Sequence, residues 1–158
     1  MRIFSSLVLV SLITPQLAFA QERLLVDLPL GQVSIAMDKD FAAIAKSPSV
    51  RGTVLIDTAY APKLKATHKN SILLEVSPGG NACPVDYVWL TLSESDLKLS
   101  DYTNSCSEGA QVVETDGYPR LVVDDINDPQ NRYSYDFDGT ALSSRQIDPE
   151  TPAVGNDP

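Results

Sequence analysis

One stretch, from Ser77 to Ser107, constrains the fold more than any other part of the chain. It contains both cysteines, Cys83 and Cys106, and the only tryptophan, Trp89. A Ser-Pro-Gly-Gly-Asn sequence leads into Cys83 and is typical of a turn. The stretch therefore combines a turn, a pair of sulfur atoms and two apolar runs within one short segment.

The two apolar runs predict a β-hairpin. Residues 85–92 are rich in β-branched and aromatic side chains, residues 93–96 are polar, and residues 97–102 form the returning strand. If the loop is symmetric, the residue numbers of every facing pair add up to the same value. This places Leu92 opposite Leu97, Tyr87 opposite Tyr102 and Cys83 opposite Cys106. Facing residues have Cα atoms roughly 4.5–5.5 Å apart, within the range of a disulfide. The sequence predicts a Cys83–Cys106 bond, with two buried free thiols as the alternative.

Both faces of this hairpin are apolar, which is typical of a strand pair inside a sandwich or under other elements. We expect Trp89 to pack in the core, because tryptophan is mostly buried. The alternative is a half-exposed Trp89 on a binding face. One face carries Val88, Leu90, Leu92, Leu97 and Leu99, and the other carries Val85, Tyr87, Trp89 and Tyr102.

The N-terminus predicts export. A positive start, an apolar run from Ile3 to Ile13 and an Ala-Phe-Ala site ending at Ala20 form a secretory signal peptide, residues 1–20, cleaved before Gln21. The alternative is an N-terminal membrane anchor. The style of the signal indicates the bacterial periplasm, or secretion. An oxidising compartment fits a disulfide.

The charge is unevenly distributed. The chain carries 12 Lys and Arg against 21 Asp and Glu. Residues 21–93 contain seven acidic and seven basic side chains, and residues 94–158 contain fourteen acidic and four basic ones. An acidic half argues against nucleic acid or anionic lipid as a partner. It permits a basic protein or a cation, although a solvated surface is the simpler interpretation.

The rest of the chain predicts a single β-rich domain over residues 21–144 and a disordered tail over 145–158, which is rich in Pro, Asp and Asn. We expect a mainly β fold, an antiparallel sandwich or curled sheet of about seven to nine short strands. One short helix is expected from Asp38 to Lys46, with a buried stripe of Phe41, Ile44 and Ala45. The lysine-containing segment 60–70, with the only histidine, is interpreted as a connection.

Catalytic motifs are weak. His68 is the only histidine, and nothing around it resembles a nucleophile elbow, so no catalytic residue and no zinc site are assigned. The pairs Asp124-Asp125 and Asp136-x-Asp138 would serve a carboxylate-dependent hydrolase only if both members faced one groove.

Asp125-Ile126-Asn127-Asp128-Pro129 is similar to the Asp-x-Asn-Asp element of cadherin calcium linkers. That resemblance makes Asp125, Asn127 and Asp128 weak calcium candidates, since carboxylate and amide oxygens suit a hard cation. The alternative is a hairpin turn shaped by Asn and Asp.

A wider resemblance covers about half of the predicted mature chain. Its residues are Gly79-Gly80-Asn81-Ala82-Cys83-Pro84, Cys106-Ser107, Tyr133-x-Tyr135-Asp136 and Asp138-Gly139. In these the chain resembles small exported proteobacterial proteins of uncharacterised function, which implies a compartment and a fold but no activity. We expect a non-catalytic periplasmic binding or interaction protein without a cofactor. The alternatives are an acidic inhibitor or immunity protein against a basic cell-wall hydrolase or toxin, and a small carboxylate-dependent hydrolase.

Overall fold

The computed structural model describes residues 23–148 apart from residues 39, 41, 81 and 129. The predicted signal peptide, Gln21, Phe41 and most of the predicted tail lie outside these residues. Within the described part the chain forms twelve strands and no helix, and therefore no helix that would be long and apolar enough to cross a bilayer. The strands are β1 (Arg23–Leu28), β2 (Gly31–Met37), β3 (Ala43–Lys46), β4 (Thr53–Ile56), β5 (Lys63–His68), β6 (Ser71–Val76), β7 (Asp86–Leu92), β8 (Leu97–Leu99), β9 (Gln111–Val113), β10 (Arg120–Asp124), β11 (Arg132–Phe137) and β12 (Leu142–Ile147).

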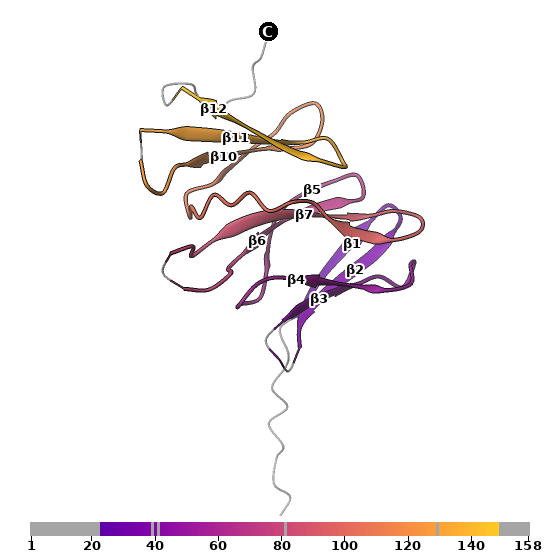
Figure 1. Cartoon of the computed structure of the whole chain (residues 1–158). Helices are drawn as coiled ribbons and strands as arrows, with labels where there is room; N and C mark the ends of the chain where they lie inside the picture. Colours follow the sequence, from indigo (N-terminus) through magenta and orange to yellow (C-terminus); the bar gives the residue numbers. More distant parts are fainter. Residues whose placement is uncertain (1–22, 39, 41, 81, 129, 149–158) are drawn as a thin grey trace, which may run out of the picture.

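Three antiparallel sheets follow one another along the chain, each of four strands. Sheet A consists of β1 to β4, sheet B of β5 to β8 and sheet C of β9 to β12, and in each sheet neighbours in sequence are neighbours in space. Figure 1 shows the sheets as stacked layers, with sheet C at the top, sheet B in the middle and sheet A at the bottom. The predicted mainly β architecture is confirmed, but the described residues form three layers with twelve strands instead of the seven to nine expected.

Sheet B is central because its two inner strands are apolar on both faces. Alternate residues of β6 and β7 join a core shared with sheet A, and the residues between them join a core shared with sheet C. Ile72, Leu74, Val76, Val88, Leu90 and Leu92 belong to the first core, and Leu73, Tyr87 and Trp89 to the second. Trp89 is 2% exposed and stacks on Phe137 with ring centroids 5.0 Å apart, so its predicted place in the core is confirmed.

The predicted hairpin register is confirmed at the loop. Leu92 faces Leu97, and Leu90 faces Leu99. The Ser100 N–H still donates to the Trp89 carbonyl, but the next bond runs from the Thr103 N–H to the Tyr87 carbonyl. One extra residue therefore enters the returning chain.

This extra residue turns Tyr102 to the opposite face from the one predicted. Its ring packs on the core between sheets A and B, and its hydroxyl accepts a hydrogen bond from the Asp57 N–H at 2.9 Å. The expectation that Tyr102 would lie opposite Tyr87 and beside Trp89 was wrong. The Cys83–Cys106 disulfide is nevertheless present, with Cα atoms 4.4 Å apart.

The helix predicted from Asp38 to Lys46 was wrong. Its last four residues are β3, where Ala43 and Ala45 enter the core and Ile44 faces outward. Apolar residues with a period of two suit a strand between β2 and β4, even though alanine favours helices. The Asp38 carboxylate, just after β2, accepts the N–H groups of Asp40 and Ala42, at 2.8 and 2.9 Å.

One further strand was missed, and the extent of another, expected at Ala141–Leu142, was underestimated, because both lie at sheet edges and carry few apolar residues. The predicted connection 60–70 contains β5, which pairs with β6 through a register shift between Leu64 and Ala66. β12 pairs with β11 as far as Ile147, three residues past the predicted domain end at 144. Backbone hydrogen bonds define both strands, and polar side chains do not prevent such bonds.

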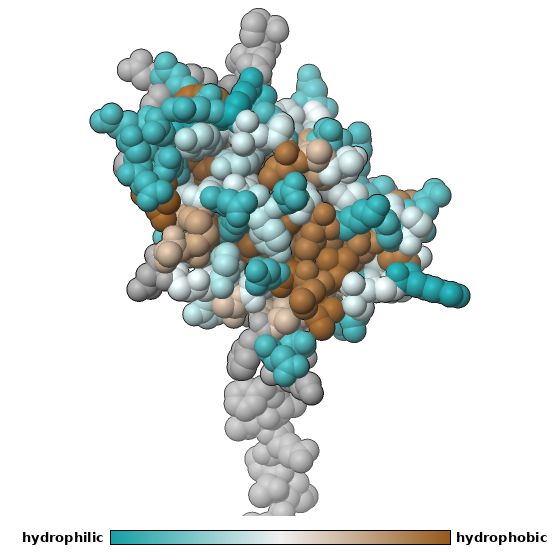
Figure 2. Space-filling model, viewed as in Figure 1, coloured by the Kyte–Doolittle hydropathy of each residue, from teal (hydrophilic) through white to brown (hydrophobic). Residues whose placement is uncertain are grey.

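The two outer faces of the stack differ. The outer face of sheet C carries Arg120–Asp136 and Arg132–Asp124 ion pairs, at 2.7 and 2.8 Å. Figure 2 shows mainly hydrophilic side chains over this sheet, and the largest hydrophobic patch of the view lies over the lower layers. The face of sheet A that points away from the core includes Leu25 and Leu55, which are 52% and 64% exposed.

We expect the disulfide to stabilise the fold through the unfolded chain. Replacing both cysteines by serine should lower the free energy of unfolding by about 3 kcal/mol, because the bond closes a loop with a sequence separation of 23 residues. Urea denaturation of the oxidised protein and of the double variant measures this difference. A loss below about 1 kcal/mol would show that the rest of the hairpin already restrains the unfolded chain.

Tyr87 makes folding sensitive to alkaline pH. Burial, followed by the charge of Glu75, raises the pKa of its hydroxyl from 10.0 to about 12. Between these values the unfolded chain loses a proton that the folded chain keeps, so this contribution to stability is complete below pH 10 and lost by pH 12. Tyr87→Phe should flatten the fall in unfolding free energy over this range, while Tyr60→Phe, on a 68% exposed side chain, should not. Equal profiles for both variants would contradict this assignment.

Candidate functional site

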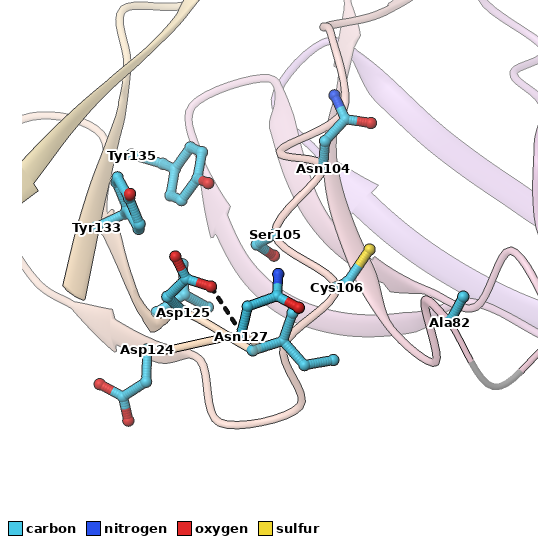
Figure 3. Close-up of a pocket in the computed structure, with 11 residues that line it drawn as sticks. Ala82, Asn104, Ser105, Cys106, Asp124, Asp125, Asn127, Tyr133 and Tyr135 are labelled. Carbon is cyan, nitrogen blue, oxygen red and sulfur yellow. Dashed lines mark hydrogen bonds between the residues drawn. The ribbon is translucent and has the colours of Figure 1, made fainter. Parts of the chain in front are cut away.

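A pocket of about 620 Å³ lies where the chain crosses from sheet B to sheet C. One wall comes from the disulfide loop and the other from the end of β10, the following loop and β11 (Figure 3). The lining residues are mostly polar, and two are tyrosines. They are Ala82, Asn104, Ser105, Cys106, Val123, Asp124, Asp125, Ile126, Asn127, Tyr133 and Tyr135.

The wall from sheet C follows the alternation of a strand. Tyr133 and Tyr135 stand on the inner face of β11, where Tyr133 lies opposite Val123 and Tyr135 opposite Leu121 of β10. Burial, followed by the charges of Asp86, Tyr133 and Asp125, raises the pKa of the Tyr135 hydroxyl. The Tyr135 phenol therefore keeps its proton near pH 7, and the hydroxyls of both tyrosines can donate or accept hydrogen bonds.

The neighbouring carboxylates Asp124 and Asp125 have different surroundings. Asp124 lines the rim, but its Oδ1 pairs with Arg132 Nε at 2.8 Å, and its side chain points away from the tyrosines in Figure 3. The Asp125 side chain lies between the tyrosines and Asn127. Its Oδ1 accepts only the backbone N–H of Asn127, at 2.8 Å, and no ion pair among the described residues includes it.

The loop after β10 is a turn built by its own Asn and Asp side chains. The Asp128 carboxylate accepts the Gln130 N–H and an N–H of the Asn131 side chain, both at 3.1 Å. The Asp125 N–H bonds to the Asn131 carbonyl at 2.9 Å and closes the hairpin. This is the turn alternative from the sequence. The calcium assignment to Asp125, Asn127 and Asp128 stays a prediction, since only the first two line the pocket and no cluster of three His, Cys, Asp or Glu suited to a metal occurs in the described residues.

A buried carboxylate holds the wall of the pocket that carries Asn104 and Ser105. Asp86, at the start of β7, is 3% exposed. It accepts hydrogen bonds from the Tyr87 N–H at 2.8 Å, from the Thr103 hydroxyl, and from the Asn104 N–H at 3.2 Å. All three donors are uncharged. Asn104 and Cys106 on this wall have left-handed backbone conformations, with φ of 52° and 53°, which non-glycine residues rarely adopt. The bond from the Asn104 N–H to Asp86 restrains the first of them.

Two more contacts complete this wall. The Tyr87 hydroxyl donates to the Ser107 carbonyl at 3.0 Å, and the Cys83–Cys106 bond ties the loop to the start of β7. The sequence pointed to the cysteines but gave no signal for Asn104 or Ser105. The tyrosines were predicted only as one face of a half-buried strand.

The remaining candidates lie elsewhere. His68, at the end of β5, packs against Tyr118 with ring centroids 4.5 Å apart, and its Nε2 is buried without a hydrogen-bond partner in the described structure. Asp136 is directed to Arg120 on the outer face of sheet C, and Asp138 accepts N–H groups of Thr140 and Ala141 in the next turn. Of the two predicted carboxylate pairs, only Asp124 and Asp125 lie at the pocket, and their side chains point apart.

Comparison with protein families, with curated proteins and with solved structures gave no match for this chain. The geometry of the pocket is therefore the basis for a proposal about function.

Asp86 should be the residue on which this wall of the pocket depends. Asp86→Ala leaves buried N–H and hydroxyl donors without an acceptor, so we expect a loss of about 3 kcal/mol in the free energy of unfolding. Urea denaturation measures this loss. Asp101→Ala, which removes an exposed carboxylate from the same connection, should change stability by less than about 0.5 kcal/mol. If the two variants unfolded alike, Asp86 would not hold the loop.

Proposed function

We propose that this protein is an exported, non-catalytic binding protein whose pocket takes a cationic group of its ligand. The observation that carries the proposal is the Asp125 carboxylate beside Tyr133 and Tyr135, in a pocket of about 620 Å³ and without an ion-pair partner among the described residues. A concave pocket in which a carboxylate and several hydrogen-bonding groups converge can bind and orient a small polar ligand.

An ammonium group fits these side chains. Its charge would be matched by Asp125, and the tyrosine rings attract cations through their faces, with about 0.5–2 kcal/mol for each favourable contact. Amide and hydroxyl groups of Asn104 and Ser105 supply further hydrogen bonds on the opposite wall. A neutral or anionic ligand would leave Asp125 without compensation.

The distribution of charge supports the same ligand class. The acidic half of the chain, residues 94–158 with fourteen acidic and four basic side chains, forms sheet C and most of the pocket lining. Such a field concentrates cations near the pocket and accelerates their association. The disulfide is compatible with an oxidising compartment, and with the predicted signal peptide over 1–20 it supports a periplasmic or secreted location.

The second candidate is an inhibitor or immunity protein for a basic cell-wall hydrolase or toxin. The same acidic half favours it, with a Lys or Arg side chain of the enzyme in the place of the small cation. A carboxylate-dependent hydrolase receives less support. Its two carboxylates would have to face one groove, whereas Asp124 is paired with Arg132 and Asp125 faces the tyrosines.

We expect Asp125 to determine binding of a cationic probe. Nα-acetyl-lysine methylamide should bind, and Asp125→Asn should weaken it about tenfold, because Asn keeps an oxygen for the Asn127 N–H but loses the charge. Asp124→Asn is the matched control, with the same charge change on the adjacent residue and an expected effect below about twofold. Calorimetry or NMR titration at two salt concentrations measures both.

The neutral probe Nα,Nε-diacetyl-lysine methylamide separates charge from shape, and it should not bind. Equal binding of the two probes, or equal losses in the two variants, would contradict the proposed cation site. If the small probe fails and a basic hydrolase binds with a dependence on Asp125, the inhibitor candidate replaces the small-ligand one.

A further inference from the structure

The open edge of β1 is suited to pairing with another strand. Each of the three sheets has two edge strands, so the described structure has six edges: β1, β4, β5, β8, β9 and β12. Four of them are protected in ordinary ways. β4, β8 and β9 have only four, three and three residues, and β5 carries Lys63 and Lys65 beside a register shift. β1 is six residues long and pairs with β2 in an unbroken register.

The hairpin geometry shows which backbone groups of β1 are free to pair. Leu28 faces Gly31 across the two-residue turn Pro29–Leu30, so these two form the closing hydrogen-bonded pair. Hydrogen-bonded pairs alternate along an antiparallel ladder, so the backbone groups of Val26 and Leu24 also bond to β2. The N–H and C=O groups of Arg23, Leu25 and Asp27 therefore point to the open edge.

We infer that β1 pairs antiparallel with β1 of a second copy of this chain, around a twofold axis at Leu25. In this register Leu25 faces Leu25 of the second copy, and Arg23 of each copy faces Asp27 of the other. Every facing pair of this edge then consists of residues whose backbone groups are free. The two four-stranded A sheets become one continuous sheet of eight strands.

The side chains are complementary in the same register. Arg23, Leu25 and Asp27 alternate onto one face, the outer face of sheet A, so an apolar pair is flanked by two opposite-charge pairs. Arg23 Nε donates to Ser34 Oγ at 3.0 Å, and Asp27 Oδ1 accepts from Gln32 Nε2 at 2.8 Å. These bonds orient both side chains and leave the other guanidinium donors and the Asp27 Oδ2 for the second copy.

β12 is the other six-residue edge with an unbroken register, and it lacks this complementarity. The edge groups of β12 belong to Leu142, Ser144 and Gln146, so a self-pairing centred on Ser144 places Leu142 opposite Gln146. Arg145 is the one charged residue of this strand, so no opposite charges meet. The matched charges of β1 are the reason to choose a second copy of this chain as the partner. The proposed ligand pocket is lined by residues between 82 and 135 and by none from sheet A, so it stays open in the dimer. The dimer and the ligand site can therefore be tested independently.

Sedimentation velocity of the purified mature protein, from about 1 µM to 1 mM, tests the pairing, since an edge contact of this size forms a weak dimer. Wild type should show a reversible dimer. Arg23→Asp and Asp27→Arg should each raise the dimer dissociation constant about tenfold, because like charges then face each other twice. The double variant exchanges the charges and should restore the wild-type constant. Lys46→Asp is the control, as it repeats the charge change of Arg23→Asp on an exposed residue of the inner strand β3.

A second variant tests the backbone pairing alone. Leu25→Pro removes an N–H that points to the open edge, a position at which an edge strand tolerates proline. It should abolish the dimer while the monomer keeps its circular dichroism spectrum. A protein that stays monomeric at 1 mM, a dimer that survives Leu25→Pro, or a double variant that fails to restore the dimer would each overturn the proposal.

Discussion

Burial of β6 and β7 on both faces is the constraint on which the rest of the structure depends. A strand has two faces, and here each is apolar, so sheet B cannot be stable with water on either side. Sheet A covers one face and sheet C the other, each as a simple four-stranded meander. Because each layer uses consecutive strands, few long crossings are needed, and the three layers follow the order of the sequence.

The site arises where the chain crosses from sheet B to sheet C. After β8 the chain leaves sheet B, runs beside the start of β7 and then enters sheet C at β9. A crossing of this kind has no strand partner for much of its length, so its backbone needs other partners. The buried Asp86, the Tyr87 hydroxyl and the disulfide supply them. The fixed loop that results is one wall of the pocket.

Much of the central hairpin could be predicted from sequence because local rules determine it. Loop symmetry gave the pairing of Leu92 with Leu97, and apolar alternation gave the two buried faces. The extra residue before Thr103 could not be predicted. It accompanies the hydrogen bond from the Asp57 N–H to the Tyr102 hydroxyl, which joins segments that are distant in sequence. β3 could not be predicted either, because its pairing with β2 and β4, which are separate segments, outweighs its helix propensity. For the pocket, the acidic loop and the cysteines were visible in the sequence, but their approach depends on how sheet C packs on sheet B.

The layered arrangement also separates two kinds of surface. The half of the chain that forms sheet A and most of sheet B has balanced charge, whereas the half with sheet C is strongly acidic. Burial uses the inner faces of both end sheets, which leaves the edge of one and the loop end of the other for contacts with other molecules. A balanced, alternating edge such as β1 suits pairing with itself, because each charge finds its opposite in a twofold arrangement. An acidic pocket such as that around Asp125 repels other negatively charged surfaces, including the same pocket of a second copy, and attracts cations. Because the pocket lies between sheets B and C and the β1 edge belongs to sheet A, a second copy and a ligand would not compete for the same part of the molecule.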